Sequence, residues 1–155
     1  MTNSVYLAPV MKKATILFLL LFTLSQGKAQ VKPAPADNVL AMFMGNFTDD
    51  YGIRYTITDK VWQQLPRTKF HIIKWDVVQQ FILAKNDSAN PGEGGLYTRI
   101  DYMRFNNMEP WKWGFCLTVY DAKTEAAALA ITAADRANPR KGCNGFPFSR
   151  MKMVE

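Results

Sequence analysis

Residues 96–120 decide the fold class, and they read LYTRIDYMRFNNMEPWKWGFCLTVY. Leu96–Phe105 and Trp111–Tyr120 are both rich in aromatic and β-branched residues, and Asn106–Pro110 between them has the composition of a turn. In the second run every other residue from Trp111 to Val119 is apolar, which indicates a strand with one buried face. Two such runs joined by a short turn predict a pair of antiparallel strands.

The same kind of pattern continues on both sides of this pair. Tyr51–Thr58 alternates apolar and polar residues, Asn86–Gly95 has the composition of a loop, and three further runs are strand-like: Lys69–Trp75, Gln79–Lys85 and Phe148–Val154. Short consecutive strands with short connections predict an antiparallel meander or a small barrel of about six strands.

Helical patterns occur in two places. Ala122–Ala137 is rich in alanine, contains no Gly or Pro, follows Asp121 as a capping residue, and is stopped by Asn138-Pro139. A short helical stretch is expected over 37–44. The fold class is therefore mainly β (α+β), with one C-terminal amphipathic helix that covers an open face or a barrel mouth.

The N-terminus has the pattern of a cleavable signal peptide. Lys12 and Lys13 precede eleven residues without a charge, Ala14–Leu24, and Gly27 and Ala29 fit a signal-peptidase site. The predicted organisation is a signal peptide over 1–29, with its start at Met1 or Met11, a Pro-rich linker over 30–36, and one domain over 37–155. The apolar run is too short to span a bilayer, and no cysteine lies near the cleavage site, so no membrane anchor is expected after cleavage.

The net charge and the cysteine content of the mature chain bear on its partners and its location. Removal of the first 29 of 155 residues takes three lysines with it and lowers the net charge from +6 to +3. No Lys/Arg run interleaves with aromatic residues, so a nucleic-acid partner is not expected. Cys116 and Cys143 favour a disulfide in an exported protein, worth about 3.5 kcal/mol by loop closure, with two free thiols as the alternative. The predicted location is the periplasm or the extracellular space.

Gly45-Asn46-Phe47 precedes the first predicted strand and resembles the Gly-x-Trp signature with which lipocalin and other calycin barrels open. The resemblance covers the order of elements from Gly45 onward; phenylalanine replaces the tryptophan, and six predicted strands stand against the eight of a lipocalin. It implies a cavity for a small apolar ligand. The tail 142–151, GCNGFPFSRM, resembles a signature of secreted bacterial proteins.

Two groups of titratable residues are candidates for chemistry. His71, the only histidine, lies on a predicted strand and suits general acid–base work, but a lone strand histidine is usually structural. The adjacent Asp49 and Asp50 either converge on a cation at a turn or cap that turn. Neither a metal site nor a cofactor is expected from these patterns.

Arg99 and Asp101 share one face of a predicted strand with Tyr97 and Met103. If this face points outward, the pair is an exposed ion pair of about 0–1 kcal/mol. If it faces a cavity, the two side chains are polar anchors in an aromatic ligand pocket.

Aromatic residues and the C-terminal motif complete the candidates. Trp75 and Trp113 belong to an aromatic set that builds either a core or a ligand-binding surface. The motif 143–150, CNGFPFSR, is either a turn held by the disulfide or a recognition loop in which Arg150 meets an anion. The ligand-binding candidates are Trp75, Tyr97, Arg99, Asp101, Trp113 and Arg150.

The leading prediction is an exported binding or interaction domain without catalysis, whose partner is a small apolar or aromatic ligand or a protein. Two alternatives remain: a small extracytoplasmic hydrolase that uses Asp101 or His71, and a purely structural exported domain.

Overall fold

The computed structural model describes residues 39–154. The predicted signal peptide and linker lie outside the described residues, as does the start of the predicted domain. No helix among the described residues is long and apolar enough to cross a bilayer.

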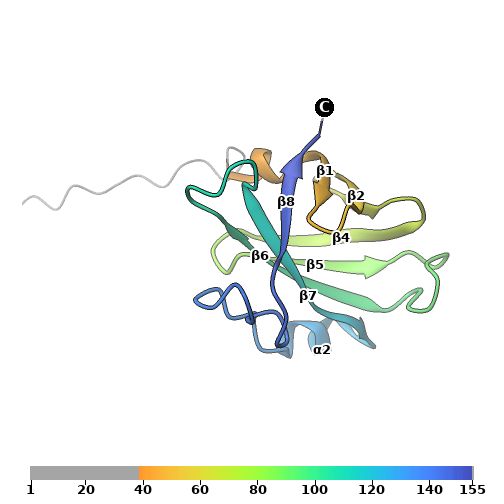
Figure 1. Cartoon of the computed structure of the whole chain (residues 1–155). Helices are drawn as coiled ribbons and strands as arrows, with labels where there is room; N and C mark the ends of the chain where they lie inside the picture. Colours follow the sequence, from red (N-terminus) through yellow and green to blue (C-terminus); the bar gives the residue numbers. More distant parts are fainter. Residues whose placement is uncertain (1–38, 155) are drawn as a thin grey trace, which may run out of the picture. The chain divides into compact units, whose positions relative to one another are not determined.

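Eight antiparallel strands close into a barrel in which each strand pairs with its neighbours in sequence, and β8 pairs with β1 (Figure 1). Among the described residues, the 3-10 turn η1 precedes the barrel and helix α2 lies between the last two strands. The elements are η1 (Ala41–Phe43), β1 (Gly45–Asp49), β2 (Arg54–Ile57), β3 (Val61–Gln64), β4 (Thr68–Asp76), β5 (Phe81–Asn86), β6 (Tyr97–Arg104), β7 (Trp113–Ala122), α2 (Glu125–Ala130) and β8 (Ser149–Met153).

The barrel interior is filled with aromatic side chains. The ring of Trp113 lies 5.2 Å from that of Phe43, 5.3 Å from Phe47 and 5.8 Å from Trp62, between ring centroids, in edge-to-face contacts. Phe43 comes from η1, so the 3-10 turn contributes its side chain to the barrel core. Such contacts add to the free energy gained by burying large rings. Trp113 therefore belongs to the core, which is one of the two roles expected for the aromatic set.

The prediction of about six strands was too low by two, β1 and β3. Both are short, and each contributes one large buried apolar side chain, Phe47 or Trp62, so their alternation is weak in the sequence. These two strands are needed to close the barrel. An open sheet would have edge strands with unpaired backbone N–H and C=O groups, and a closed barrel has no edge strands.

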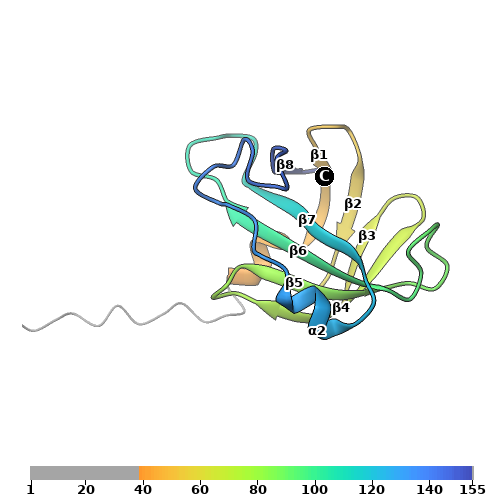
Figure 2. The ribbon, with the colours of Figure 1, turned by 90° about the horizontal axis from the view of Figure 1, so that it is seen from below.

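The predicted helix over Ala122–Ala137 was too long. Helix α2 ends at Ala130, because Ile131 is already extended at ψ 139°, and its N-cap is Thr124 rather than Asp121. Ala128 packs with Phe81 and Leu83, so α2 covers the outer face of the β5–β7 sheet and not a barrel mouth (Figure 2).

The predicted apolar face of the Trp111–Tyr120 run is only partly correct. Trp113 and Phe115 point into the barrel, but Trp111 precedes β7 and lies outside, beneath charged side chains of β8. Val119 packs on the outer face with Phe81 and Ala128, because the register shift between Arg99 and Ile100 inserts an extra residue of β7 and reverses its face. Bulges of this kind re-aim side chains within a regular ladder.

Tyr102 gives the barrel a specific sensitivity to alkaline pH. Burial, aided by the charge of Asp76, raises the pKa of the Tyr102 phenol to about 12. The fold therefore favours the neutral phenol, and this stabilisation is complete below pH about 10 and is lost as the pH rises toward 12. At about pH 11 the loss due to Tyr102 is on the order of 1 kcal/mol relative to about pH 8.

Urea denaturation at these two pH values tests the assignment. Tyr102→Phe should lose less stability on alkalinisation than the wild-type protein by that amount, whereas Tyr120→Phe, at a half-exposed position, should behave like the wild type. Equal alkaline losses in Tyr102→Phe and the wild type would contradict the role of this phenol.

Candidate functional site

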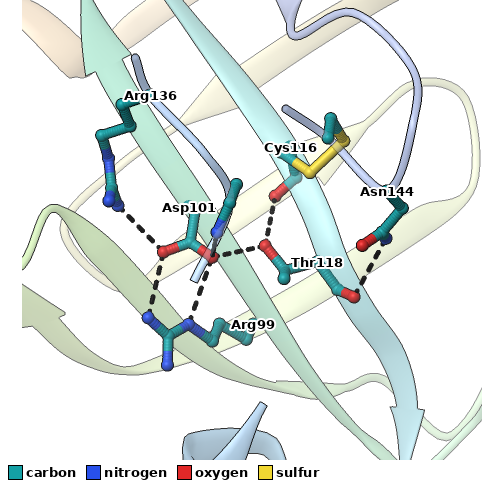
Figure 3. The surroundings of a disulfide bond; sticks show 8 residues. Arg99, Asp101, Cys116, Thr118, Arg136 and Asn144 are labelled. Carbon is teal, nitrogen blue, oxygen red and sulfur yellow. Dashed lines mark hydrogen bonds and ion pairs between the residues drawn. A yellow bond between two sulfur atoms is a disulfide. The ribbon is translucent and has the colours of Figure 1, made fainter. Parts of the chain in front are cut away.

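The C-terminal segment is attached to the outside of the barrel by a disulfide. Cys116 on β7 and Cys143 in the loop before β8 are joined with an S–S distance of 2.03 Å, which confirms the predicted disulfide (Figure 3). Cys116 packs with Ala134 and Phe148, so it faces outward from the barrel as expected and is covered by the returning chain. The disulfide thus fixes the loop that precedes the last strand.

Arg99 and Asp101 also lie on the outer face of the barrel, as one of the two expectations had it, but they are not exposed. The segment after α2 covers them, leaving Arg99 5% and Asp101 0% exposed, so the pair is not the exposed ion pair that this expectation described. Arg99 donates from Nη2 to Asp101 Oδ1 at 3.1 Å and from Nε to Oδ2 at 3.2 Å (Figure 3). Its Nη1 donates to the carbonyls of Leu129 and Ile131, at the end of α2.

Asp101 is the centre of this buried network. Its Oδ1 also accepts from Arg136 Nη2 at 2.9 Å, and its Oδ2 accepts from the Thr118 hydroxyl and from the Ala134 backbone N–H (Figure 3). Arg136 in turn donates to the carbonyls of Gln79, Gln80 and Tyr102. A buried carboxylate with this many donors is well compensated, so the network holds the segment after α2 on the barrel.

A groove lies beside this fixed segment. The β6–β7 turn and the loop that leads into β8 both line it. Together with the β1–β2 turn they enclose a volume of about 500 Å³. We call this the C-terminal groove, and its lining residues are Asp50, Tyr51, Phe105, Met108, Pro139, Arg140, Pro147, Phe148 and Arg150.

Gly114 on β7 allows the aromatic wall of the groove to approach the barrel. A Cβ at this position would lie 2.6 Å from Cζ of Phe105 and 3.0 Å from the Ser149 carbonyl oxygen. Phe105 therefore lies directly against the backbone of β7, where any larger residue would displace it.

Asp50 and Arg150 form the best-defined polar contact in the groove. Asp50 Oδ2 accepts from Arg150 Nε at 2.9 Å, and Asp50 Oδ1 accepts from the Arg150 backbone N–H at 3.0 Å. The Arg150 guanidinium also lies over the ring of Trp111, 5.2 Å from its centroid. The β1–β2 turn is thereby attached to the start of β8, across 100 residues of sequence.

The six predicted ligand-binding residues do not come together. Trp113 is buried in the barrel interior, and the half-buried Trp75 packs against the same interior cluster. Tyr97 packs on the outer face of the barrel against Phe81 and Leu83, and the Lys85 ammonium lies over its ring. Of the six, Arg150 lines the C-terminal groove. Ligand binding at the other five stays a prediction without a shared site.

Sequence reasoning missed most of the groove. Phe105 and Met108 belong to a turn that separates two strands, and Arg140 lies in a loop that was expected only to end a helix. The available signal was the presence of apolar residues in a turn, because turns are normally polar.

The candidate acid–base residues lie in separate networks. His71 Nε2 is 2.7 Å from Asp87 Oδ2 on the barrel surface, and the Ala89 backbone N–H, with His71, holds the pKa of Asp87 below its ordinary value. Asp49 accepts from the Tyr51 and Ile53 N–H groups and from the Tyr55 hydroxyl, so it closes the β1–β2 turn.

These contacts give Asp49 its turn-capping role rather than a cation site. Burial and the hydrogen bond to Asp49 raise the pKa of Tyr55 far above its ordinary value. Within 39–154, no group of three or more His, Cys, Asp or Glu side chains is arranged to hold a metal ion.

No family model matches the sequence, and comparisons with curated proteins and with solved structures give no significant match. The eight-stranded antiparallel barrel with a 3-10 turn before β1 is compatible with a lipocalin-like fold.

Proposed function

We propose that this protein is an exported binding module that holds a small apolar or aromatic ligand in the C-terminal groove. The observation that carries the proposal is the groove itself, whose volume of about 500 Å³ lies within the ordinary range of ligand sites, roughly 300–1,000 Å³. Its walls combine the rings of Tyr51, Phe105 and Phe148 with Met108, the composition expected for binding an apolar molecule.

The packing of the barrel supports a site on its outside rather than within it. Trp62 and Trp113 are each 1% exposed and occupy the interior together with Phe43 and Phe47. A ligand at that place would have to displace several large rings in mutual contact, at a cost of several kcal/mol. In the groove, by contrast, Tyr51 is 69% exposed and available for contact.

Export is supported by two independent features. The disulfide between Cys116 and Cys143 is a bond typical of oxidising compartments, and the residues 1–29 have the pattern of a signal peptide. The proposed location is the periplasm or the extracellular space.

Titration of the isotope-labelled protein with 4-phenylbutanamide, a neutral aromatic probe, tests the site by NMR. We expect amide shifts at the β6–β7 turn and at 147–150. Met108→Asp places a charge on the apolar wall and should weaken binding by about tenfold or more, because burying an unpaired charge costs more than the 1.4 kcal/mol that this factor represents.

Val78→Asp is the matched control. Val78 is 89% exposed in the β4–β5 turn and does not line the groove, so its replacement should leave the affinity unchanged. Shifts that map to another surface, or equal affinities for Met108→Asp and the wild type, would refute the proposed site.

A further inference from the structure

We propose that the C-terminal groove selects ligands that carry a carboxylate, and that Arg140, which lines the same groove as Arg150, is the specificity-determining cation. This inference rests on the proposed function, since it names the chemical class of the ligand that the groove takes. It is carried by the way in which the three charged residues of the groove are paired.

Arg150 is fixed in place before any ligand arrives. Its Nε and its backbone N–H both donate to Asp50, and its guanidinium carbon lies over the ring of Trp111, 5.2 Å from the centroid. Among the described residues this side chain donates from Nε, so the donors of its terminal amino groups remain for a ligand, and the side chain is 43% exposed. A guanidinium held on two sides loses little further freedom when it binds an anion.

The carboxylate of Asp50 is already engaged within the protein. Both of its carboxylate oxygens accept hydrogen bonds from Arg150, and it therefore compensates the charge of that residue. The groove thus contains one internally paired couple and one further charge.

Arg140 is that further charge. It lies in the loop between α2 and β8, its side chain is exposed, and it forms no ion pair within the part of the chain that the structure describes. The three charged lining residues leave a net charge of +1, on a groove whose other walls are apolar or aromatic. Such a site complements an amphipathic molecule with an apolar body and one negative group.

A carboxylate is the group that suits this arrangement. The planar guanidinium presents parallel N–H donors that match the two oxygens of a carboxylate, and hydrogen bonds between charged groups are roughly twice as strong as neutral ones. Because the groove is open to water, the contribution of the charge should decrease as salt is added.

The test compares two probes with the same apolar body and different head groups, the charged 4-phenylbutanoate and the neutral 4-phenylbutanamide, by NMR titration of the full domain with its disulfide intact. The wild-type protein should bind the carboxylate about tenfold or more tighter than the amide, as expected for a charge-assisted hydrogen bond. Arg140→Gln should reduce this preference to about threefold or less, while the affinity for the neutral amide stays the same.

Arg67→Gln is the matched control, since Arg67 is exposed in the β3–β4 turn and does not line the groove. It should keep the full preference for the carboxylate. Equal binding of both probes by the wild type, or an undiminished preference in Arg140→Gln, would overturn this inference but leave the proposed function standing. Failure of both probes to bind the groove would overturn the proposed function itself.

Discussion

Replacing Asp101 by alanine is expected to lower the free energy of unfolding by about 3–5 kcal/mol, the range for breaking a buried ion pair by removing one partner. The carboxylate is fully buried and accepts from Arg99, Arg136, Thr118 and the Ala134 N–H. Its removal leaves the guanidinium of Arg99, only 5% exposed, without a counter-charge. Urea denaturation followed by circular dichroism measures the change.

An exposed ion pair provides the control for this substitution. Asp59 contacts Lys60 at 3.7 Å, and both side chains are more than half exposed, so Asp59→Ala should cost less than about 1 kcal/mol. If Asp101→Ala does not fold, Asp101→Asn, which keeps a polar group of the same size but removes the charge, is measured instead and should still cost more than Asp59→Ala. A cost for Asp101→Ala as small as that for Asp59→Ala would show that the network does not hold the segment after α2.

The Asp101 network explains why the sequence pattern did not predict that the outer face of β6 is buried. Period-2 reasoning requires one face of a strand to be wetter than the other, and the face that carries Ile100 and Tyr102 lies in the core. This reasoning could not place Arg99 and Asp101, because their cover comes from a segment 30 to 35 residues along the sequence. A strand buried on both faces with charges on one of them looks like an ordinary surface strand.

At the end of helix α2, tertiary hydrogen bonds outweigh the local preference of the sequence for a longer helix. Ala122–Ala137 has a strong helical composition, but the carbonyls of Leu129 and Ile131 are taken by Arg99, and Ala134 donates to Asp101. The chain gains more from these buried hydrogen bonds than from two further helical turns, because alanine-rich segments this short are marginal helices alone.

The groove was the least predictable feature. Its walls come from the β1–β2 turn, the β6–β7 turn and the loop before β8, which the sequence separates widely. Only barrel closure and the pairing of β8 with both β1 and β7 bring these segments together. For the C-terminal motif the structure has the turn held by the disulfide, one of the two expectations, but the sequence could not show that Arg150 pairs with Asp50, 100 residues away.

Removal of the disulfide should affect both stability and the groove. Cys116→Ala/Cys143→Ala is expected to lower the free energy of unfolding by about 3.5 kcal/mol in the chain-entropy model, because the bond closes a loop over a sequence separation of 27. The same bond fixes the start of the loop whose Pro147 and Phe148 form one wall of the groove, so binding of 4-phenylbutanamide should weaken as well.

The two measurements separate the roles of the disulfide. Other contacts also hold the loop and the chain before it. The side-chain amide of Asn144 donates to the Thr118 carbonyl at 3.2 Å (Figure 3), and Arg136 donates to three carbonyls of the barrel. If stability falls by the expected amount while probe affinity is unchanged at a temperature where the variant is folded, these hydrogen bonds suffice to shape the groove. If both fall, the disulfide acts in the native state too, since an effect confined to the unfolded chain cannot weaken binding to the folded protein.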